Sequence, residues 1–236
     1  MKKIRDWVRM ACLFIRLVFE MLRNYSSLND DMLNNFQVCK KICKKVVKSA
    51  KINLSIENQE RIPQEKPFLL VSNHRCFFDV VFLLSVLDYA VSFVAAEELW
   101  HYPVLRKYLS SIQCIALDRY TKNVAKIKSG INGMKEALTN GNVVLFPEGE
   151  CSYYDEEMHP FKKGSFLGVI GVDANIVPAF IEIHEIRNIG RWMIPQGEVR
   201  IKVGDSFSTD SIGDGKRAAE LAKYVQNKVG EMRKKS

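Results

Sequence analysis

His74 and Asp79, five positions apart, are the first residues in this chain whose types could together perform proton transfer. They follow an apolar run that predicts a strand over 68–72. An aspartate bonded to one imidazole nitrogen fixes the tautomer and raises the basicity of the other nitrogen. Positions five apart differ by about 140° on a helix. The two side chains could therefore meet only if His74 lies on a turn and Asp79 opens the next helix. By itself, this spacing also fits an exposed loop histidine and an aspartate that only caps the helix.

A second segment places an acidic side chain directly after another apolar run. Residues 146–149 read Phe-Pro-Glu-Gly. Proline ends a strand's hydrogen bonding and glycine permits a tight turn, so Glu148 would be held rigidly at the edge of a sheet. A fixed carboxylate can accept hydrogen bonds from a polyol, or from backbone amides that shape a pocket. An ordinary strand-ending turn would explain this segment equally well if it stood alone.

Both segments fall within an alternation of short apolar runs and longer helical patterns that begins at residue 52. The predicted strands cover 52–56, 68–72, 91–95, 113–118, 142–146, 176–183 and 198–203, and the predicted helices cover 79–88, 97–110, 121–139, 162–173 and 213–232. This rhythm predicts an α/β layered domain with a mixed, largely parallel sheet flanked by helices. The loops at the carboxyl ends of such strands are where a site should lie.

The charge of the chain is concentrated at its N-terminus. The 236 residues, 47% of them hydrophobic, are enough for one sizeable core, and they carry a net charge of +8. Residues 1–51 contain twelve Lys and Arg against four Asp and Glu, which accounts for all of that charge. A basic N-terminus before a neutral remainder indicates an anionic partner. The predicted division is a membrane-association segment over 1–51 and a catalytic domain over 52–236.

Two amphipathic helices are predicted in the basic segment. Over 4–23 the charges form one narrow stripe beside a wide apolar arc, which is typical of a helix lying in a membrane surface with its basic residues toward phosphate. A second helix over 29–51 has an apolar stripe and six lysines, and it could equally pack on the body of the protein. The longest uncharged stretch, 137–147, is too short to span a bilayer. No zinc spacing, helix-turn-helix signal or aromatic-rich basic strand favours nucleic acid, so we expect a membrane partner and no nucleic acid.

The cysteines and histidines predict neither a disulfide framework nor a metal site. The six cysteines include no C-x-x-C pair, and the four histidines lack metal-ligand spacing. Reduced core thiols and an uncleaved N-terminus indicate a cytoplasmic location, which the basic helices would place at the membrane face.

Four sequence blocks, taken together, carry a resemblance to a known family. They are Asn73-His74-x₄-Asp79, Ile-Ala-Leu-Asp-Arg at 115–119, Phe-Pro-Glu-Gly at 146–149 and Ile-Val-Pro-Ala-Phe at 176–180. Over about residues 52–205 the chain resembles the glycerolipid acyltransferases, that is, the PlsC-type 1-acylglycerol-3-phosphate acyltransferases and related lysophospholipid acyltransferases.

The resemblance implies a reaction and a set of residues. His74 would be the general base, oriented by Asp79, for a lysoglycerolipid hydroxyl that attacks an acyl-CoA or acyl carrier protein thioester. The acceptor would be lysophosphatidate or a related lysophospholipid. The family's mechanism needs no cofactor, no metal and no acyl-enzyme, so none of the cysteines would be a nucleophile. The implied substrate-binding residues are Asn73, Arg75, Arg119, Phe146, Pro147, Glu148, Gly149, Glu150 and Lys163.

The chain departs from the family pattern near the acceptor. The third block usually continues with Thr-Arg, where this chain has Glu150 and Cys151, and Ala96 and Glu97 stand where relatives often carry lysines. Exchanging cations for carboxylates disfavours a dianionic headgroup. Four cations could compensate: Arg75, Arg119, Lys162 and Lys163. Four readings stay open: a phospholipid acceptor, a neutral or amino-containing hydroxy-lipid acceptor, a thioester hydrolase, and a silent member that only binds membrane.

Overall fold

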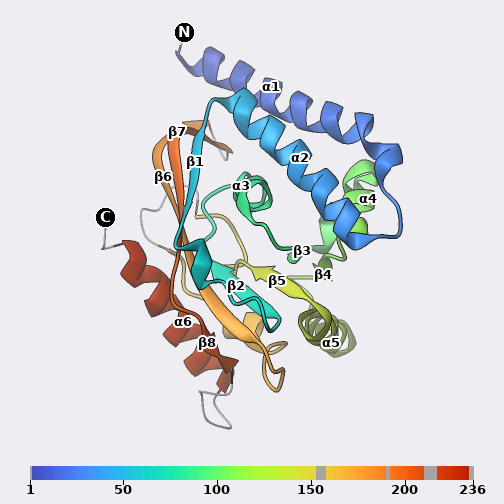
Figure 1. Ribbon diagram of the computed structural model, residues 1–236, viewed down its shortest axis with the longest axis vertical. Helices are drawn as coiled ribbons and strands as arrows, with labels where there is room; N and C mark the ends of the chain where they lie inside the picture. Colours follow the sequence, from blue (N-terminus) through green and yellow to red (C-terminus); the bar gives the residue numbers. More distant parts are fainter. Residues whose placement is uncertain (1, 153–157, 190–191, 210–216, 234–236) are drawn as a thin grey trace.

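A single mixed sheet organises the chain (Figure 1). The computed structural model describes residues 2–152, 158–189, 192–209 and 217–233. Its helices are α1 (Lys2–Arg23), α2 (Met32–Ala50), α3 (Asp79–Val86), α4 (Pro103–Ser111), α5 (Val124–Asn140) and α6 (Arg217–Arg233). Its strands are β1 (Asn53–Glu57), β2 (Phe68–Ser72), β3 (Val91–Ala96), β4 (Ile115–Leu117), β5 (Asn142–Leu145), β6 (Asn175–Ile189), β7 (Trp192–Val203) and β8 (Phe207–Ser208).

The strand order confirms the predicted fold class. The order is β1-β7-β6-β2-β5-β3-β4, with β8 paired to β6. Among the described residues, five strand pairings are parallel, and β6 with β7 and β6 with β8 are antiparallel. The long β6–β7 hairpin therefore makes the sheet mixed, while the segments that carry the predicted site follow parallel strands.

Helices cover both faces of the sheet, which explains why its central strands read as uninterrupted apolar runs. All five residues of β2 are buried. Leu70 packs into a core with α2 and α3, whereas Leu69 and Val71 pack into a second core with α5 and α6. Figure 1 shows the two helical layers on opposite sides of the sheet. This double coverage holds β2 firmly, so the loop that leaves its carboxyl end starts from a fixed point.

Two predicted helices differ from the structure. The segment 97–110 divides into a 3₁₀ turn at Glu97–His101 and α4, because Pro103 lacks a backbone N–H and occupies the start of a helix. The predicted helix 162–173 is wrong: it contains only one 3₁₀ turn, at Lys163–Phe166, followed by turns. Its three glycines make a helix unfavourable there. The predicted helix 213–232 corresponds to α6, and positions 213–216 lie outside the described residues.

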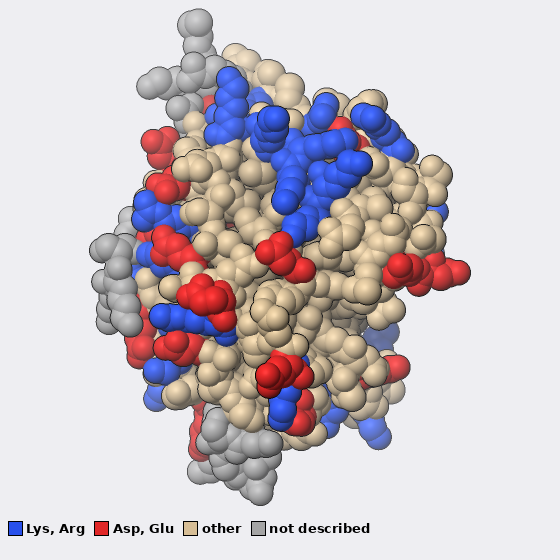
Figure 2. Space-filling view, viewed as in Figure 1, with Lys and Arg blue, Asp and Glu red and all other residues tan. Residues whose placement is uncertain are grey.

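The apolar stripe of α2 packs on the body of the protein. Phe36, Cys39, Cys43, Val46 and Ala50 are buried in the core shared with α3, which is the packing alternative left open by the sequence. One of the six lysines also faces inward: Nζ of Lys40 donates to the carbonyl of Leu87 and to Asp88, each at 2.7 Å. Other lysines form a basic patch along α2 (Figure 2). They are Lys41, Lys44, Lys45 and Lys48.

Only part of the charged stripe of α1 faces outward. Glu20 is fully buried and pairs with Arg16 at 2.9 Å and with Lys45 of α2 at 2.8 Å. Arg9 donates to the carbonyl of Ala50 at the end of α2, whereas Arg16 and Arg23 are exposed. The apolar arc is divided as well: Met10 and Leu13 are buried in the core, and other large apolar side chains of α1 are exposed. The exposed residues are Ile4, Trp7, Val8, Ile15, Val18, Phe19 and Leu22. Among the described residues, no helix is both long and apolar enough to span a bilayer.

Glu20→Ala should weaken the attachment of α1 to α2. A buried carboxylate hydrogen-bonded to a cation contributes about 1.5–3 kcal/mol, and we expect a loss in that range in urea unfolding. The hydrogen bond from Lys45 lowers the pKa of Glu20 from its usual 4.5, against the effect of burial. Its stabilisation is therefore present above pH 4.5 and lost as the pH falls through the lowered value. Glu136→Ala, in an exposed position of α5, is the control. Equal stability of the two variants would contradict the assigned role.

Candidate active site

The two segments singled out in the sequence leave the sheet side by side. β2 and β5 are parallel neighbours, with Val71 paired to Leu145. The loop 73–78 and the turn 146–149 therefore begin at the same edge of the sheet. This is the position in which parallel α/β sheets place their ligand sites.

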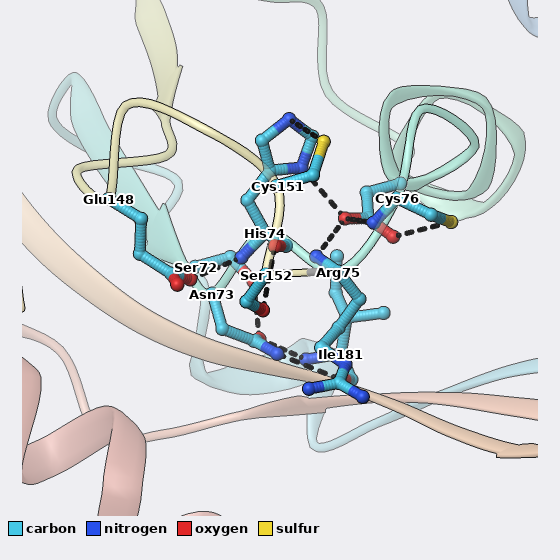
Figure 3. Close-up of polar contacts among 10 residues, drawn as sticks. Ser72, Asn73, His74, Arg75, Cys76, Glu148, Cys151, Ser152 and Ile181 are labelled. Atoms are coloured by element: carbon cyan, nitrogen blue, oxygen red, sulfur yellow. Dashed lines mark hydrogen bonds and ion pairs between the residues drawn. The ribbon is translucent and has the colours of Figure 1, made fainter. Parts of the chain in front are cut away.

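His74 and Asp79 meet in the arrangement that proton transfer requires. His74 lies on the turn after β2 (Figure 3). Asp79 is the first residue of α3. Nδ1 of His74 is 2.8 Å from Oδ2 of Asp79. The same oxygen accepts hydrogen bonds from the backbone amides of Arg75 and Cys76 at 2.6 and 2.9 Å. Asp79 is fully buried and thus held in place, so it fixes the imidazole with Nε2 directed away from α3.

The backbone of His74 is clamped from the opposite side by the segment after β5. Its amide donates to Oε1 of Glu148 at 2.6 Å, and its carbonyl accepts a hydrogen bond from the amide of Ser152 at 2.8 Å. Its ring stacks on Phe146, with centroids 4.3 Å apart. The other oxygen of Glu148 accepts from the amide of His159 at 2.7 Å. Of the two roles that the sequence allowed for Glu148, the structure shows hydrogen bonds to backbone amides that shape the site.

Nε2 of His74 contacts a residue that the family pattern does not predict. Sγ of Cys151 lies 3.2 Å from it. Burial alone would lower the pKa of His74, but the hydrogen bonds with Asp79 and Cys151 raise it from 6.5 to about 10. The contact with Cys151 contributes to this rise, so the pKa of His74 is lower, and the neutral ring forms more readily, when substrate takes the place of the thiol at Nε2.

A cavity of about 630 Å³ opens at this histidine. Most of its lining is apolar and comes from several helices, including Leu17 of α1, Ile42 of α2 and Leu84 of α3. Its polar lining residues include His74, Arg119, Cys151 and Lys162. An apolar cavity of this size with a few polar groups is typical of a site for a largely apolar ligand.

Two cations meet at the turn after β5. Arg119, which follows β4, donates to the carbonyl of Gly149 at 2.6 Å. Gly149 has a φ of +74°, and a Cβ atom at this position would lie 2.8 Å from Nζ of Lys162. The backbone conformation therefore favours glycine here, and the flexible end of the Lys162 side chain would have to shift to make room for any other residue. Arg119 and Lys162 together give this part of the cavity a positive charge.

The other predicted binding residues have different surroundings. Asn73 is fully buried and exchanges hydrogen bonds with the backbone of Ile181 in β6, at 2.7 and 3.0 Å, so it joins the loop to the sheet. The side chain of Arg75 points away from the imidazole of His74 (Figure 3) and does not line the cavity. Pro147 is buried, while Glu150 and Lys163 are exposed and lie outside the cavity lining.

Sequence reasoning missed two kinds of contributor to the site. Cys151 was noted only as a departure from the family pattern, and its contact with His74 crosses 77 positions. The walls supplied by α1 and α2 were also missed, since the sequence suggested membrane binding for both helices and, as an alternative for α2, packing on the body, but no share in the site. A signal was available for Cys151, because it follows the Phe-Pro-Glu-Gly turn by only two positions.

A histidine held by a buried aspartate at the carboxyl edge of an α/β sheet, facing an apolar cavity, is suited to general-base chemistry on a largely apolar substrate. The acyltransferase family model matches residues 53–182, which is more than half of the 236-residue chain. The chain therefore belongs to the acyltransferase family.

Several known acyltransferases are similar to this chain. A 1-acyl-sn-glycerol-3-phosphate acyltransferase of Bacillus subtilis is 23% identical over 81% of this chain and 94% of that protein. A chloroplastic enzyme of the same name from Arabidopsis thaliana is 30% identical over 75% of this chain but only 48% of its own length. The chain thus spans about half of that longer relative. The crystal structure of the 1-acyl-sn-glycerophosphate acyltransferase PlsC from Thermotoga maritima shares the fold, with a TM-score of 0.76 over 99% of this chain and 98% of that one, at 21% identity.

Proposed function

We propose that this enzyme transfers a fatty acyl group from an acyl-CoA or acyl carrier protein thioester to the hydroxyl of a lysoglycerolipid at a membrane surface. The observation that carries the proposal is the position of the His74 imidazole, bonded to Asp79 and facing the apolar cavity. The cavity suits a fatty acyl chain. Nε2 of His74 is the atom that would take the proton from the acceptor hydroxyl.

An anionic acceptor such as lysophosphatidate suits the polar end of the cavity. Arg119 and Lys162 approach the same glycine, so they could bind a phosphate together. The carboxylates that the sequence raised as an obstacle lie elsewhere. Glu150 is exposed and outside the cavity lining, and Glu97 pairs with Lys126 at 3.4 Å. The two similar enzymes from Bacillus subtilis and Arabidopsis thaliana are named for this acceptor, 1-acyl-sn-glycerol-3-phosphate.

The exposed apolar face of α1 supports action at a membrane surface, for which we propose the cytoplasmic face. Large apolar side chains follow one another along this face, and the lysines of α2 give the same N-terminal pair a basic patch (Figure 2). Apolar burial together with attraction to anionic lipid is how peripheral helices bind membranes. Leu17 and Met21 of α1 also line the cavity, so membrane binding would bring the acyl site to the lipid.

The test is thiol release from a long-chain acyl-CoA, and separately from an acyl carrier protein thioester, on anionic vesicles with a panel of lysolipids. We expect release coupled to the formation of diacyl product, with lysophosphatidate among the best acceptors and His74→Ala as the blank. Hydrolysis without any acceptor requirement would instead identify a thioesterase. Vesicle binding with no release from either donor would identify a silent member, and both results would overturn the proposal.

Replacing Ile15 and Phe19 together by glutamate should reduce vesicle binding. Both side chains are more than half exposed on α1, so folding does not depend on burying them. A charged group on this face opposes insertion, and burial of one such side chain contributes about 1.5–3 kcal/mol. We expect the double variant to bind anionic vesicles about 10²-fold more weakly. Leu33→Glu, an exposed apolar position of α2, is the control. Unchanged flotation of the double variant would contradict membrane binding through α1.

A further inference from the structure

The beginning of α5 stands clear of the rest of the protein. Residues 122–129, which lead into α5 and form its first turns, are all exposed, whereas its buried residues, Met134 and Leu138, lie in its second half. Two of the exposed side chains are large and apolar, with Val124 77% exposed and Ile127 40% exposed. Folding thus leaves this part of α5 available for contact with another molecule.

The exposed apolar side chains of α5 continue into an opening of the catalytic cavity. Ile127 and Leu167 are exposed and also line the cavity, so they mark a place where the cavity reaches the surface. Tyr120, just before α5, is 75% exposed as well. We call Tyr120, Val124, Ile127 and Leu167 the apolar rim. Exposed apolar residues gathered beside a site are typical of a surface that binds a partner.

Basic side chains accompany the apolar rim. Residues 119–128 contain four lysines or arginines and no acidic residue. Lys126 pairs with Glu97 and Asp118 at 3.4 and 3.3 Å. Three other lysines are exposed, lie outside the cavity lining and make no ion pair among the described residues: Lys122, Lys128 and Lys163. The outer surface beside the opening is therefore positively charged.

The apolar rim lies far from α1, the helix that we expect on the membrane. Figure 1 shows α1 along the top of the molecule and α5 at the lower right, in the helical layer on the other side of the sheet. The cavity reaches both helices, because Leu17 and Met21 of α1 line it and so do Ile127 and Ile131 of α5. With α1 on the lipid, the opening at α5 faces water. This arrangement favours a water-soluble partner over a second membrane contact.

We propose that the apolar rim and its lysines dock a small acidic carrier protein that presents the acyl thioester on a phosphopantetheine arm. This inference rests on the proposed acyltransferase function and assigns the surface that recognises its donor. The lysines complement an acidic protein surface and the phosphate of the arm, while docking covers the apolar side chains. The arm passes Ile127 and Leu167 and brings the thioester to His74, and the lysolipid arrives from the side of α1.

The discriminating experiment compares palmitoyl-acyl carrier protein with palmitoyl-CoA as donors for lysophosphatidate on anionic vesicles. CoA carries the same arm on a nucleotide rather than on a protein, so it does not need the outer residues. Val124 and Lys128 lie one turn apart on α5, exposed and outside the cavity lining. We expect the double variant Val124→Glu/Lys128→Glu to raise KM for the carrier-protein donor about 10-fold or more, with kcat and the KM for palmitoyl-CoA unchanged. Lys223→Glu, at an exposed position of α6, is the control and should change the kinetics of neither donor.

Carbodiimide cross-linking of the wild-type enzyme to the carrier protein, followed by mass spectrometry, measures docking without catalysis. We expect cross-links from carrier carboxylates to Lys122 or Lys128, and fewer of them at high salt. Transfer from palmitoyl-CoA alone, equal kinetic effects on both donors, or cross-links that avoid α5 would overturn the docking surface and leave the proposed function intact. Release of the double variant from vesicles would identify the rim as a membrane contact and would also overturn it. Transfer from neither donor, with the α5 cross-links present, would overturn the proposed function and support the docking surface.

Discussion

His74→Gln is expected to lower kcat/KM for acyl transfer about 10³- to 10⁴-fold, the upper range for loss of a general base. Glutamine keeps a polar side chain of similar length, but it cannot accept a proton from an acceptor hydroxyl. The measurement is the rate of diacyl product formation on vesicles at saturating donor.

Folding should survive this change, because the backbone hydrogen bonds of His74 that join the two loops do not depend on its ring. Its amide and carbonyl bind Glu148 and Ser152, and these contacts remain in the variant. His101→Gln, at an exposed position in the turn before α4, is the matched control and should retain full activity. A His74→Gln variant that transfers acyl groups within tenfold of the wild-type rate would remove His74 from the chemistry.

Asp79→Asn is expected to lower the same rate about 10²- to 10⁴-fold. Asparagine lacks the negative charge that stabilises the imidazolium formed when His74 takes a proton, and which the carboxylate now places 2.8 Å from Nδ1. The hydrogen bonds from the amides of Arg75 and Cys76 are also weaker without the charge of the carboxylate. We therefore expect the free energy of unfolding to fall by about 1.5–3 kcal/mol.

The Asp79 variant also has a pH signature. Hydrogen bonding and charge from Asp79 help to raise the pKa of His74 to about 10, against the effect of burial. Removing the negative charge must lower that pKa, so the imidazole deprotonates at lower pH than in the wild type. The ring can be followed by NMR titration even if catalysis is lost. Asp173→Asn, at an exposed ion pair with Lys66, should change neither rate nor titration. An unshifted His74 titration in Asp79→Asn would contradict the assigned contact.

The local sequence pattern was sufficient to predict the strand, the turn and the helix start that surround the site. The apolar run 68–72 became β2 with the predicted bounds, and its buried residues explain why it could be recognised. The turn at 146–149 and the helix start at Asp79 were also predictable, because proline, glycine and a helix-opening aspartate act within a few residues of themselves. The helix predicted over 162–173 was wrong because the spacing of its apolar residues suggested a helix, whereas its glycines favour turns.

The orientation of α1 could not be read from its sequence. Its narrow charged stripe suits contact with lipid headgroups and contact with α2 equally well. Which face of α1 points inward depends on contacts with α2. Lys45 and the carbonyl of Ala50 in α2 bind Glu20 and Arg9 of α1. An amphipathic pattern defines two faces but does not say which of them finds a partner.

By itself, the sequence of this protein determined the alternating α/β plan, the histidine and carboxylates that can do acid–base chemistry, and the amphipathic N-terminus. Only the tertiary structure decided that Glu148 would bind backbone amides, that Arg119 and Lys162 would converge on Gly149, and that Cys151 would face Nε2 of His74. The physical reason is distance along the chain. Periodicity and turn chemistry act over a few residues, whereas these contacts join segments brought together by strand order and register, which arise from packing of the whole sheet.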